Sequence, residues 1–329
     1  MNMKTLLPSL TLLIAIPRLV SAQTTVFSDN MATSTVNQAP VAPTATSTSY
    51  EFLSGLAGGA STISPGALHL ELPSTTSVLG EAQARFSSSP VALATAGDFI
   101  NLTVTFLNTS NIMLAGNNNS SLVLGLYNSG GALPNQGIVQ LNAGNTTGGS
   151  QNWLGYFGRI IENGTANIVT RPAQTANGTS SQNQDVLFNN ASGSQAFNSP
   201  QGTQIGSKST ASTPIGLTTG STYTLDYRIT FNSSTSLTIS NALYSGSAVN
   251  TANTIFNMQS TTAAATTIAT AFDSLAIGWR ESVASATASS MDISAITVIS
   301  QIAPIPEPGC LALLAVGATA LAFRRKTRI

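Results

Sequence analysis

Residues 222–231 read TYTLDYRITF, a stretch in which every odd position is apolar and every even position is polar. Successive side chains of a β-strand point to opposite faces of the sheet, so this strict alternation predicts a strand with one buried face. Five polar residues, 232–236, separate it from the shorter alternating segment Leu237-Thr238-Ile239. The two segments together predict a β-hairpin.

The same two-residue period recurs along much of the chain, most clearly at residues 67–72 (ALHLEL) and 99–107 (FINLTVTFL). No window has the pattern of an amphipathic helix, because Ser, Thr, Asn and β-branched residues fill the candidate windows. Strands joined by turn-rich connections, without helical crossovers, predict an all-β fold: an antiparallel β-sandwich of the jelly-roll type. Further strands are expected at 121–127, 152–161, 272–281 and 291–299, with a short one at 185–188.

The composition is that of a folded but weakly charged protein, with 42% apolar and only 7% charged residues. Between residues 23 and 303 there are six basic and eleven acidic residues, a net charge of −5. This acidic balance argues against a nucleic-acid partner, because phosphate binding needs clustered cations. Cys310 is the only cysteine and lies in a C-terminal apolar run, so the chain before it has no disulfide and no thiolate metal site.

The first 22 residues have the pattern of a secretory signal peptide. Lys4 provides a basic head, residues 6–16 are mainly apolar, and Val20-Ser21-Ala22 ends the segment with small residues. We expect cleavage after Ala22 and export of the chain from Gln23 onward; a buried N-terminal helix is the alternative. Residues 23–49, rich in Ser, Thr, Ala and Pro, predict a loose segment or a poorly packed first strand.

An uncharged run of 15 residues, 309–323, lies near the C terminus and is followed by a basic cluster. As a helix it would be roughly 22 Å long, short for a bilayer core of about 30 Å, so it spans a membrane only with local thinning. The positive-inside rule keeps the cations on the cytoplasmic side, where they stop translocation. These cations are Arg324, Arg325, Lys326 and Arg328.

The tail as a whole resembles the tripartite sorting signal of PEP-CTERM proteins. It contains Pro306-Glu307-Pro308, the predicted transmembrane helix at 309–323 and a basic end at 324–329, in the order of that signal. The resemblance implies that an exosortase-type membrane protease recognises Pro306, Glu307 and Pro308 and cuts at or near them. The protein would then be released, or transferred to the cell surface or extracellular matrix. A plain tail anchor would explain the helix and the cations but not the Pro-Glu-Pro motif.

The strand order after residue 50 resembles that of exported concanavalin-A-like, or laminin-G-like, jelly rolls. The resemblance is carried by LGLYN at 124–128, the hairpin at 222–243, FDSLAIGWR at 272–280 and a closing strand at 291–298. The chain is thus expected to consist of a signal peptide (1–22), an N-terminal segment (23–49), a β-sandwich domain (50–301) and the sorting signal (302–329).

The sequence contains no pattern that indicates catalysis. His69 is the only histidine and by alternation faces solvent beside Glu71, so a catalytic triad or a histidine-rich metal site is not indicated. Glycosidases need two carboxyl groups on either side of the sugar bond, about 5 Å apart in retaining enzymes and further apart in inverting ones. The Glu-x-Asp-x-x-Glu motif that carries both groups in some concanavalin-like glucanases is absent. The other carboxylates considered lie on different predicted segments: Asp226, Asp273, Glu281 and Asp292.

Aromatic rings can stack on sugar rings, which makes Trp153 and Trp279 candidate carbohydrate contacts, with Arg159 beside the first of them. Packing in the core is the commoner use of a tryptophan on a β-strand. Asp226 shares an outward face with Arg228, which predicts a surface ion pair. Structural calcium, which the concanavalin-like resemblance implies, has weak candidate ligands at Asn117–Asn119 and Asn183–Asp185.

These observations predict an exported, non-enzymatic protein without a cofactor, sorted to the cell surface or extracellular matrix. Before processing, its C-terminal helix would anchor it in the inner membrane. Its weakly charged exterior, rich in Ser, Thr and Asn, suits a structural or adhesive role in a polysaccharide layer. A carbohydrate-binding module is the first alternative, and a polysaccharide hydrolase or lyase is the second.

Overall fold

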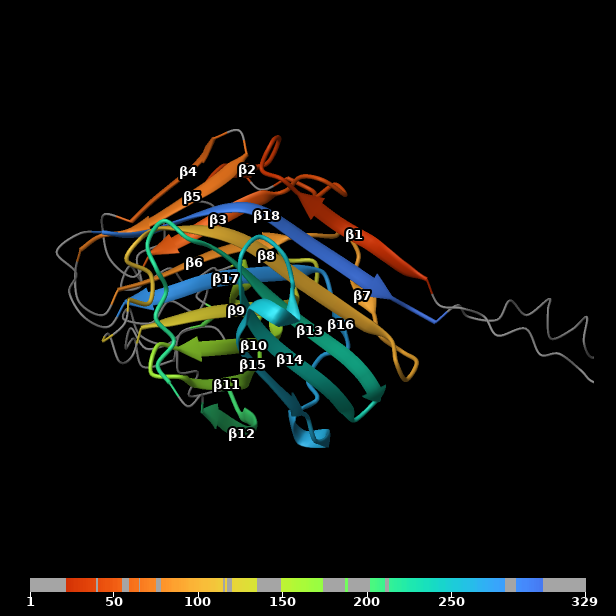
Figure 1. The fold of residues 1–329 in the computed structure, drawn as a ribbon. Helices are drawn as coiled ribbons and strands as arrows, with labels where there is room; N and C mark the ends of the chain where they lie inside the picture. The colour runs from red at the N-terminus through yellow and green to blue at the C-terminus, as the bar shows by residue number, and fades with distance from the viewer. Residues whose placement is uncertain are drawn as a thin grey trace, which may run out of the picture. The chain divides into compact units, whose positions relative to one another are not determined.

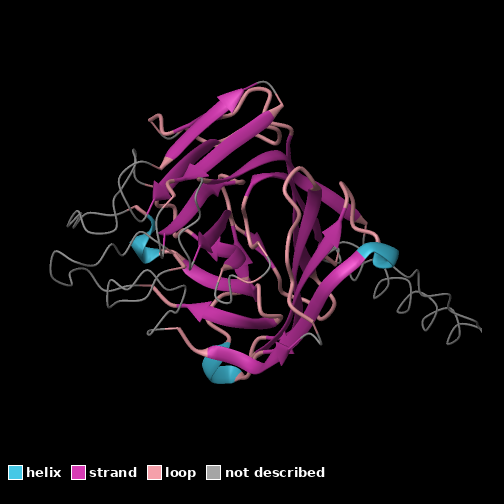
Figure 2. Ribbon diagram, turned by 60° about the vertical axis from the view of Figure 1, so that its left-hand side comes forward, coloured by secondary structure: helices cyan, strands magenta, loops and turns pink. Residues whose placement is uncertain are grey.

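The alternating pattern of the sequence appears in the structure as strands paired into two large, mainly antiparallel sheets (Figure 2). The helical elements among the residues described below are short 3-10 turns. The computed structural model describes residues 22–303, except 40, 55–58, 65, 75–77, 115, 117–119, 135–148, 174–186, 189–201, 211–212 and 282–287. The expectation of an all-β antiparallel sandwich is confirmed. Residues Gln23–Ile302 form one compact unit.

Sheet I has the strand order β15-β14-β13-β8-β18-β5-β4, and β1 also pairs with β18 (Figure 1). Every pairing in this sheet is antiparallel. Its strands are β1 (Gln23–Asp29), β4 (Ala60–Ser64), β5 (Ala67–Leu72), β8 (Phe99–Ser110), β13 (Thr222–Ser233), β14 (Ser236–Ser245), β15 (Thr254–Thr261) and β18 (Ser289–Gln301).

Sheet II has the order β12-β11-β10-β9-β17-β6-β3-β2, antiparallel except for the parallel pair β2–β3. Its strands are β2 (Thr35–Val36), β3 (Ser49–Ser54), β6 (Val78–Arg85), β9 (Ser121–Asn128), β10 (Leu154–Ile161), β11 (Thr165–Arg171), β12 (Gln204–Thr210) and β17 (Ser274–Glu281). A separate two-stranded pair joins β7 (Val91–Ala92) and β16 (Ala271–Phe272). The 3-10 turns are η1 (Ser150–Asn152), η2 (Thr251–Asn253) and η3 (Ala264–Thr266).

The hairpin predicted from residues 222–239 is confirmed as β13–β14. Leu225, Tyr227 and Ile229 of β13 are buried, as their odd positions require, and Ile229 pairs with Ile239 of β14. Thr224 departs from the pattern, because it is polar and yet 0% exposed. Its hydroxyl donates to the carbonyl oxygen of Gly246, 2.8 Å away.

The N-terminal segment expected to precede the sandwich belongs to it instead. Residues 23–29 form β1, which lies beside the C-terminal half of β18 (Figure 1). Gln23 pairs with Gln301. Phe27 is 0% exposed and joins the main core. Of the two interpretations of this segment, a first strand is therefore the one that the structure has. A pairing between residues so far apart in sequence leaves little trace in the local pattern.

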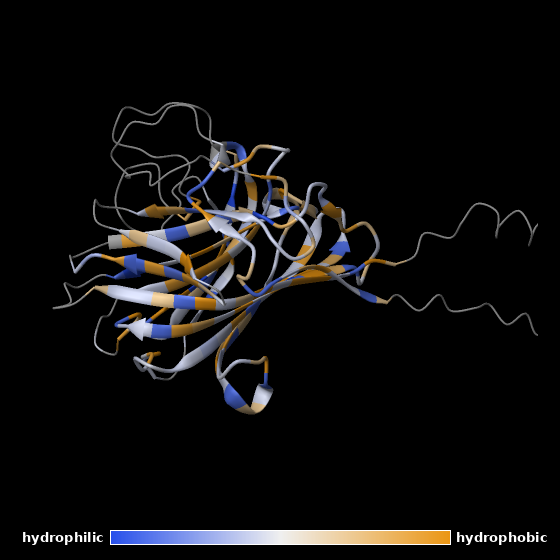
Figure 3. Cartoon of the chain, turned by 90° about the horizontal axis from the view of Figure 1, so that it is seen from above, coloured by the Kyte–Doolittle hydropathy of each residue, from blue (hydrophilic) through white to orange (hydrophobic). Residues whose placement is uncertain are grey.

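The main core lies between the two sheets. It combines Leu102 and Val104 of β8 in sheet I with Leu122, Leu124 and Leu126 of β9 in sheet II. A second buried cluster lies on the other face of sheet II and includes Leu53, Leu79, Val123, Phe157 and Phe188. Sheet II is thus covered on both faces. Hydrophobic segments recur along the strands of the sandwich (Figure 3).

Candidate functional site

The outer face of sheet II, which points away from the main core, carries several buried charged side chains. Strand register places its side chains in four rows, because one residue in two along each strand points away from the main core. The rows are Arg171-Gly155-Tyr127-Ser274-Arg85, then Val169-Phe157-Gly125-Ala276-Gln83-Glu51, then Asn167-Arg159-Val123-Gly278-Glu81-Leu53, and last Ile161-Ser121-Arg280-Leu79.

Charged groups on this face are withdrawn from solvent. Glu51 and Glu81 are both 0% exposed, Arg171 is 1% exposed and Arg159 is 7% exposed. Buried ionisable groups require polar or charged neighbours, because desolvation of a charge is costly. These four charged side chains on the outer face of sheet II are therefore packed against protein atoms and are not solvated as surface charges usually are.

Glu81 holds a short segment of chain against the face. Its Oε1 accepts hydrogen bonds from Gln83 Nε2 (2.5 Å) and the Leu187 backbone N–H (3.0 Å), while Oε2 accepts from the Phe188 N–H (3.1 Å). The Phe188 ring meets Phe157 edge-on at 5.4 Å between centroids. A Cβ on Gly278 would lie 2.4 Å from the Gly80 carbonyl oxygen and 3.1 Å from that ring, so glycine lets the neighbouring strand and the ring approach.

Burial raises the pKa of Glu81 to about 7, although three hydrogen bonds and the positive charge of Arg171 act in the opposite direction. The Tyr127 hydroxyl on the same face has its pKa raised by burial, and the charge of Glu81 adds to that effect. The Glu81 carboxyl group therefore titrates near neutral pH in the folded protein.

Trp153, a candidate carbohydrate contact, lies buried at the edge of this face. It is 0% exposed, and its ring lies 6.4 Å from that of Tyr127. The indole N–H of Trp153 donates to the Ala132 carbonyl oxygen at 3.1 Å, and Arg171 Nη1 donates to the backbone carbonyl oxygen of Trp153 at 3.0 Å. Here Trp153 anchors neighbouring chain segments and shows no ring face to solvent.

Trp279 lies on the opposite side of sheet II, in the main core. It is 0% exposed and stacks on Phe52 at a centroid distance of 6.1 Å. Its indole N–H donates to Ser289 Oγ at 2.9 Å. The structure thus brings Trp153 and Arg159 to one face of sheet II and leaves Trp279 on the other.

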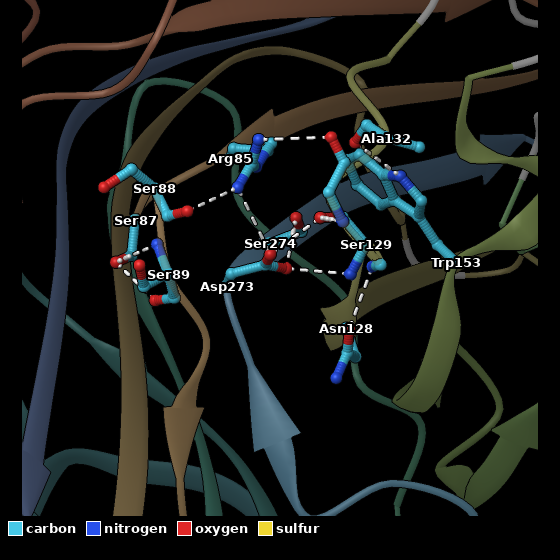
Figure 4. A network of polar contacts seen from close by, with 12 residues as sticks. Arg85, Ser87, Ser88, Ser89, Asn128, Ser129, Ala132, Trp153, Asp273 and Ser274 are labelled. Atoms are coloured by element: carbon cyan, nitrogen blue, oxygen red, sulfur yellow. Dashed lines mark hydrogen bonds and ion pairs between the residues drawn. The ribbon is translucent and has the colours of Figure 1, made fainter.

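Asp273 is the centre of a polar network at one end of sheet II (Figure 4). Its carboxylate accepts from the Ser129 N–H (2.8 Å), Ser129 Oγ (2.7 Å) and Ser274 Oγ (2.9 Å), and forms an ion pair with Arg85 at 3.4 Å. Arg85 also donates to the Ser88 carbonyl oxygen at 3.1 Å. Through these contacts Asp273 ties the turn after β9 to the start of β17 and to Arg85.

The other carboxylates considered from the sequence have structural partners as well. Asp226 accepts from Asn101 (2.7 Å) and Thr103 (3.1 Å) on sheet I, while the Arg228 guanidinium lies 3.5 Å from the centre of the Phe99 ring. The surface ion pair expected between Asp226 and Arg228 is therefore replaced by hydrogen bonds and a cation–π contact. Glu281 accepts from the Met113 N–H and from Ser120 Oγ.

His69 lies on the outer face of sheet I, partly exposed as alternation predicted. Its Nδ1 is 2.6 Å from Asp292 Oδ1, and its Nε2 is 3.8 Å from Glu71 Oε2. Within the described ranges, no group of three or more His, Cys, Asp or Glu side chains is placed to hold a metal ion. The candidate calcium ligands Asn117–Asn119 and Asn183–Asp185 lie outside those ranges.

Sequence reasoning missed most of the outer face of sheet II, including Glu51, Glu81 and Arg280. A signal was present in EAQAR at 81–85, where polar residues alternate with two alanines. Alanine is a weak marker of a strand, so this window did not stand out. The pairing of β6 with β3 and β17, which gathers the charges, depends on contacts far apart in the chain.

Comparison with known proteins found a family match only in the tail. No curated protein matches the chain. Similar solved structures include lectin II from Ulex europaeus (10% identity, 77% of this chain and 93% of that chain, TM-score 0.36) and a protein of unknown function from Shewanella oneidensis MR-1 (16% identity, 77% and 79%, TM-score 0.34). The carbohydrate recognition domain of Emp47p is also similar (10% identity, 85% and 97%, TM-score 0.39).

Lectins are therefore among the similar structures, as the concanavalin-A-like resemblance suggested. Because the TM-scores are below 0.5, the functions of these proteins are not assigned to this chain.

The described residues include no helix long and apolar enough to cross a membrane. The predicted signal peptide and the predicted helix at 309–323 lie beyond them. Residues 304–326 match the PEP-CTERM protein-sorting motif, and this chain thus carries a PEP-CTERM sorting signal at its C terminus.

Proposed function

We propose that this protein is exported and then sorted to the cell surface or extracellular polysaccharide layer, where its sandwich has a structural or adhesive role. The observation that supports this most directly is the sorting motif at 304–326, which begins a few residues after β18 ends at Gln301. The sandwich is weakly charged, which suits hydrogen bonding to hydrated polysaccharide without strong electrostatics.

The partner in sorting would be an exosortase-type membrane protease. In this proposal, Pro306, Glu307 and Pro308 are the recognised residues, and residues 309–323 hold the chain in the inner membrane until it is cut. Arg324, Arg325, Lys326 and Arg328 then act as the stop for translocation.

Replacing Glu307 tests the sorting step. We expect Glu307→Ala to keep the protein in the inner-membrane fraction, while the native chain reaches the surface or medium. Glu71→Ala is the matched control, because Glu71 is a part-exposed carboxylate of the sandwich that lies far from the motif in sequence. Equal distribution of the native and Glu307→Ala chains between membrane and surface fractions would refute the sorting proposal.

A carbohydrate-binding module is the second candidate, favoured by the charged and aromatic outer face of sheet II. A glycan array probed with the full chain in detergent tests this candidate, with Arg280→Gln on that face and Arg228→Gln on sheet I beside it. Saturable binding that is lost in a still-folded variant supports a lectin-like site, and an array without any saturable signal speaks against it.

We infer no hydrolase or lyase activity. Glycoside hydrolysis requires two carboxyl groups that can reach one sugar bond. Glu81 has both oxygens occupied by Gln83 and two backbone N–H groups, and Asp273 has both oxygens occupied by serines and Arg85. Measuring release of reducing ends from candidate polysaccharides tests this inference, and reproducible release would contradict it.

A further inference from the structure

The first residue of the sandwich coincides with the residue after the predicted signal-peptide cut. The small residues Val20-Ser21-Ala22 predict cleavage after Ala22. The compact unit begins at Gln23, and so does β1. Ala22 lies outside the strand and is exposed. A cut after Ala22 would therefore remove no residue of the sandwich and would make Gln23 the first residue of the exported chain.

The inner end of β1 is firmly held, while its outer end lies in solvent. Phe27 and Asp29 are buried, and the Asp29 carboxylate accepts a hydrogen bond from the Tyr50 hydroxyl at 2.8 Å. Residues 23–25 are exposed, although they pair with residues 299–301 of β18. The strand pairing thus fixes the backbone at the chain start and leaves the side chains there accessible.

A glutamine at a free N terminus carries both partners of a ring closure. The α-amino nitrogen attacks the side-chain amide carbon Cδ of the same residue. A bond between this nitrogen and Cδ forms, the bond from Cδ to Nε2 breaks, and Nε2 leaves as ammonia after taking up a proton. The product is a five-membered lactam, pyroglutamate, and its formation needs no oxidant or cofactor.

The position of Gln23 suits this reaction. Because both reacting groups belong to one residue, they are already close together, and no second molecule has to be bound. An α-amino group has an ordinary pKa of about 8, so part of it is unprotonated and nucleophilic near neutral pH. Gln23 is exposed, so its side chain can turn toward the amino group and the ammonia can leave.

Ring closure is compatible with the pairing of β1 and β18. The new bond lies within residue 23, so the backbone from Thr24 onward is unchanged. The lactam nitrogen keeps one hydrogen, and the carbonyl oxygen of residue 23 is not involved. The pair formed by Gln23 and Gln301 can therefore persist after the reaction.

The lactam would protect the exposed start of the sandwich. Chain ends are preferred sites of proteolysis, and an aminopeptidase needs a free α-amino group. Removal of residues 23–25 would leave residues 299–301 of β18 without their β1 partners. A closed ring removes the free amino group and so preserves this part of sheet I outside the cell.

We propose that Gln23 is a modification site, which cyclises to pyroglutamate after the signal peptide is cut and so caps β1 against aminopeptidases. This inference rests on the proposed export of the chain, because the reaction needs a free amino group at Gln23.

Mass spectrometry of the full chain recovered from the surface of its native host tests the proposal. Acidification at harvest protonates the amine, so no ring closes during handling. We expect an N-terminal peptide that starts at residue 23 and is lighter by one ammonia than the unmodified peptide. Treatment with an aminopeptidase should release no residue from this chain.

Gln23→Asn is the matched control variant. Asparagine keeps the amide and the charge, but its side chain is one methylene shorter, so the corresponding ring would have four members and is strained. This variant should retain its free amine and lose residues 23–25 stepwise to the aminopeptidase. Its thermal melt before digestion should match that of the native chain, and its N-terminal peptide shows directly where it was cut.

Three results would overturn the proposal: a native chain that starts at Gln23 with its ammonia retained, a native chain that starts at another residue, or equal trimming of the native chain and Gln23→Asn. The same spectra separate this proposal from the first one. A chain that keeps residues 1–22 would also refute export, whereas an uncyclised Gln23 at the N terminus refutes only the cap. The Glu307→Ala fractionation measures sorting independently of either result.

Discussion

Glu81 shows how a single residue links packing to pH in this protein. It sits in the middle of sheet II, hydrogen-bonded to Gln83 and to two backbone N–H groups, with Arg171 and Tyr127 as charged or titratable neighbours. Desolvation outweighs these favourable contacts, so the pKa of Glu81 rises to about 7. The proton is therefore held more tightly in the folded than in the unfolded chain.

This raised pKa predicts how stability depends on pH. A group whose pKa is higher in the folded state stabilises the fold below its unfolded pKa, and that contribution is lost as pH rises through the folded pKa. Between about pH 4.5 and 7, the free energy of unfolding should fall by up to about 3 kcal/mol through this group and level off above it.

Urea denaturation at several pH values measures the effect, with Glu81→Gln as the test variant and Glu71→Gln as the control. The difference in unfolding free energy between the native chain and Glu81→Gln should change with pH across this window. A constant difference would show that Glu81 titrates normally.

At the scale of the element, β13 shows why the sheet forms where the sequence pattern predicts. Its odd-numbered side chains enter the main core, and its even-numbered ones form hydrogen bonds along the outer face of sheet I. The strand also sits between β8 and β14, so both of its edges are paired. A long alternating segment with two paired edges has one favourable register, because a slip by one residue would expose every buried side chain.

Two neighbouring positions on β13 should respond differently to truncation. Ile229 is 0% exposed in the core, so Ile229→Ala should lower the free energy of unfolding by about 2–5 kcal/mol. Thr230 points outward and is only partly buried, so Thr230→Ala should change it by about 0.5 kcal/mol or less. Chemical denaturation of both variants checks the contrast, and equal losses would mean that the register is misassigned.

At the scale of the whole molecule, the last strand closes the fold. β18 pairs with β8 along its length, with β5 at its N-terminal end and with β1 at its C-terminal end. Gln23 lies opposite Gln301, so the first and last strands of the compact unit are neighbours. Three strands of sheet I therefore pair with the last strand of the compact unit.

Truncation separates the role of β18 from that of the tail. A chain that ends at Ile302 retains the whole compact unit and should melt cooperatively within a few degrees of the native chain. A chain that ends at Ala288 lacks β18 and should show no cooperative transition. Differential scanning calorimetry makes the comparison, and a cooperative melt of the shorter chain would show that β18 is dispensable.

The sequence by itself determined the fold class, the central hairpin and the sorting signal. Each is a local property: a period of two residues in 222–231, five polar residues at a turn, and a motif at 304–326. The tertiary structure decided the position of β1, the burial of both tryptophans and the gathering of four arginines on sheet II. Those features arise from pairings between residues far apart in the chain, and which strands become neighbours is set by the packing of the complete core.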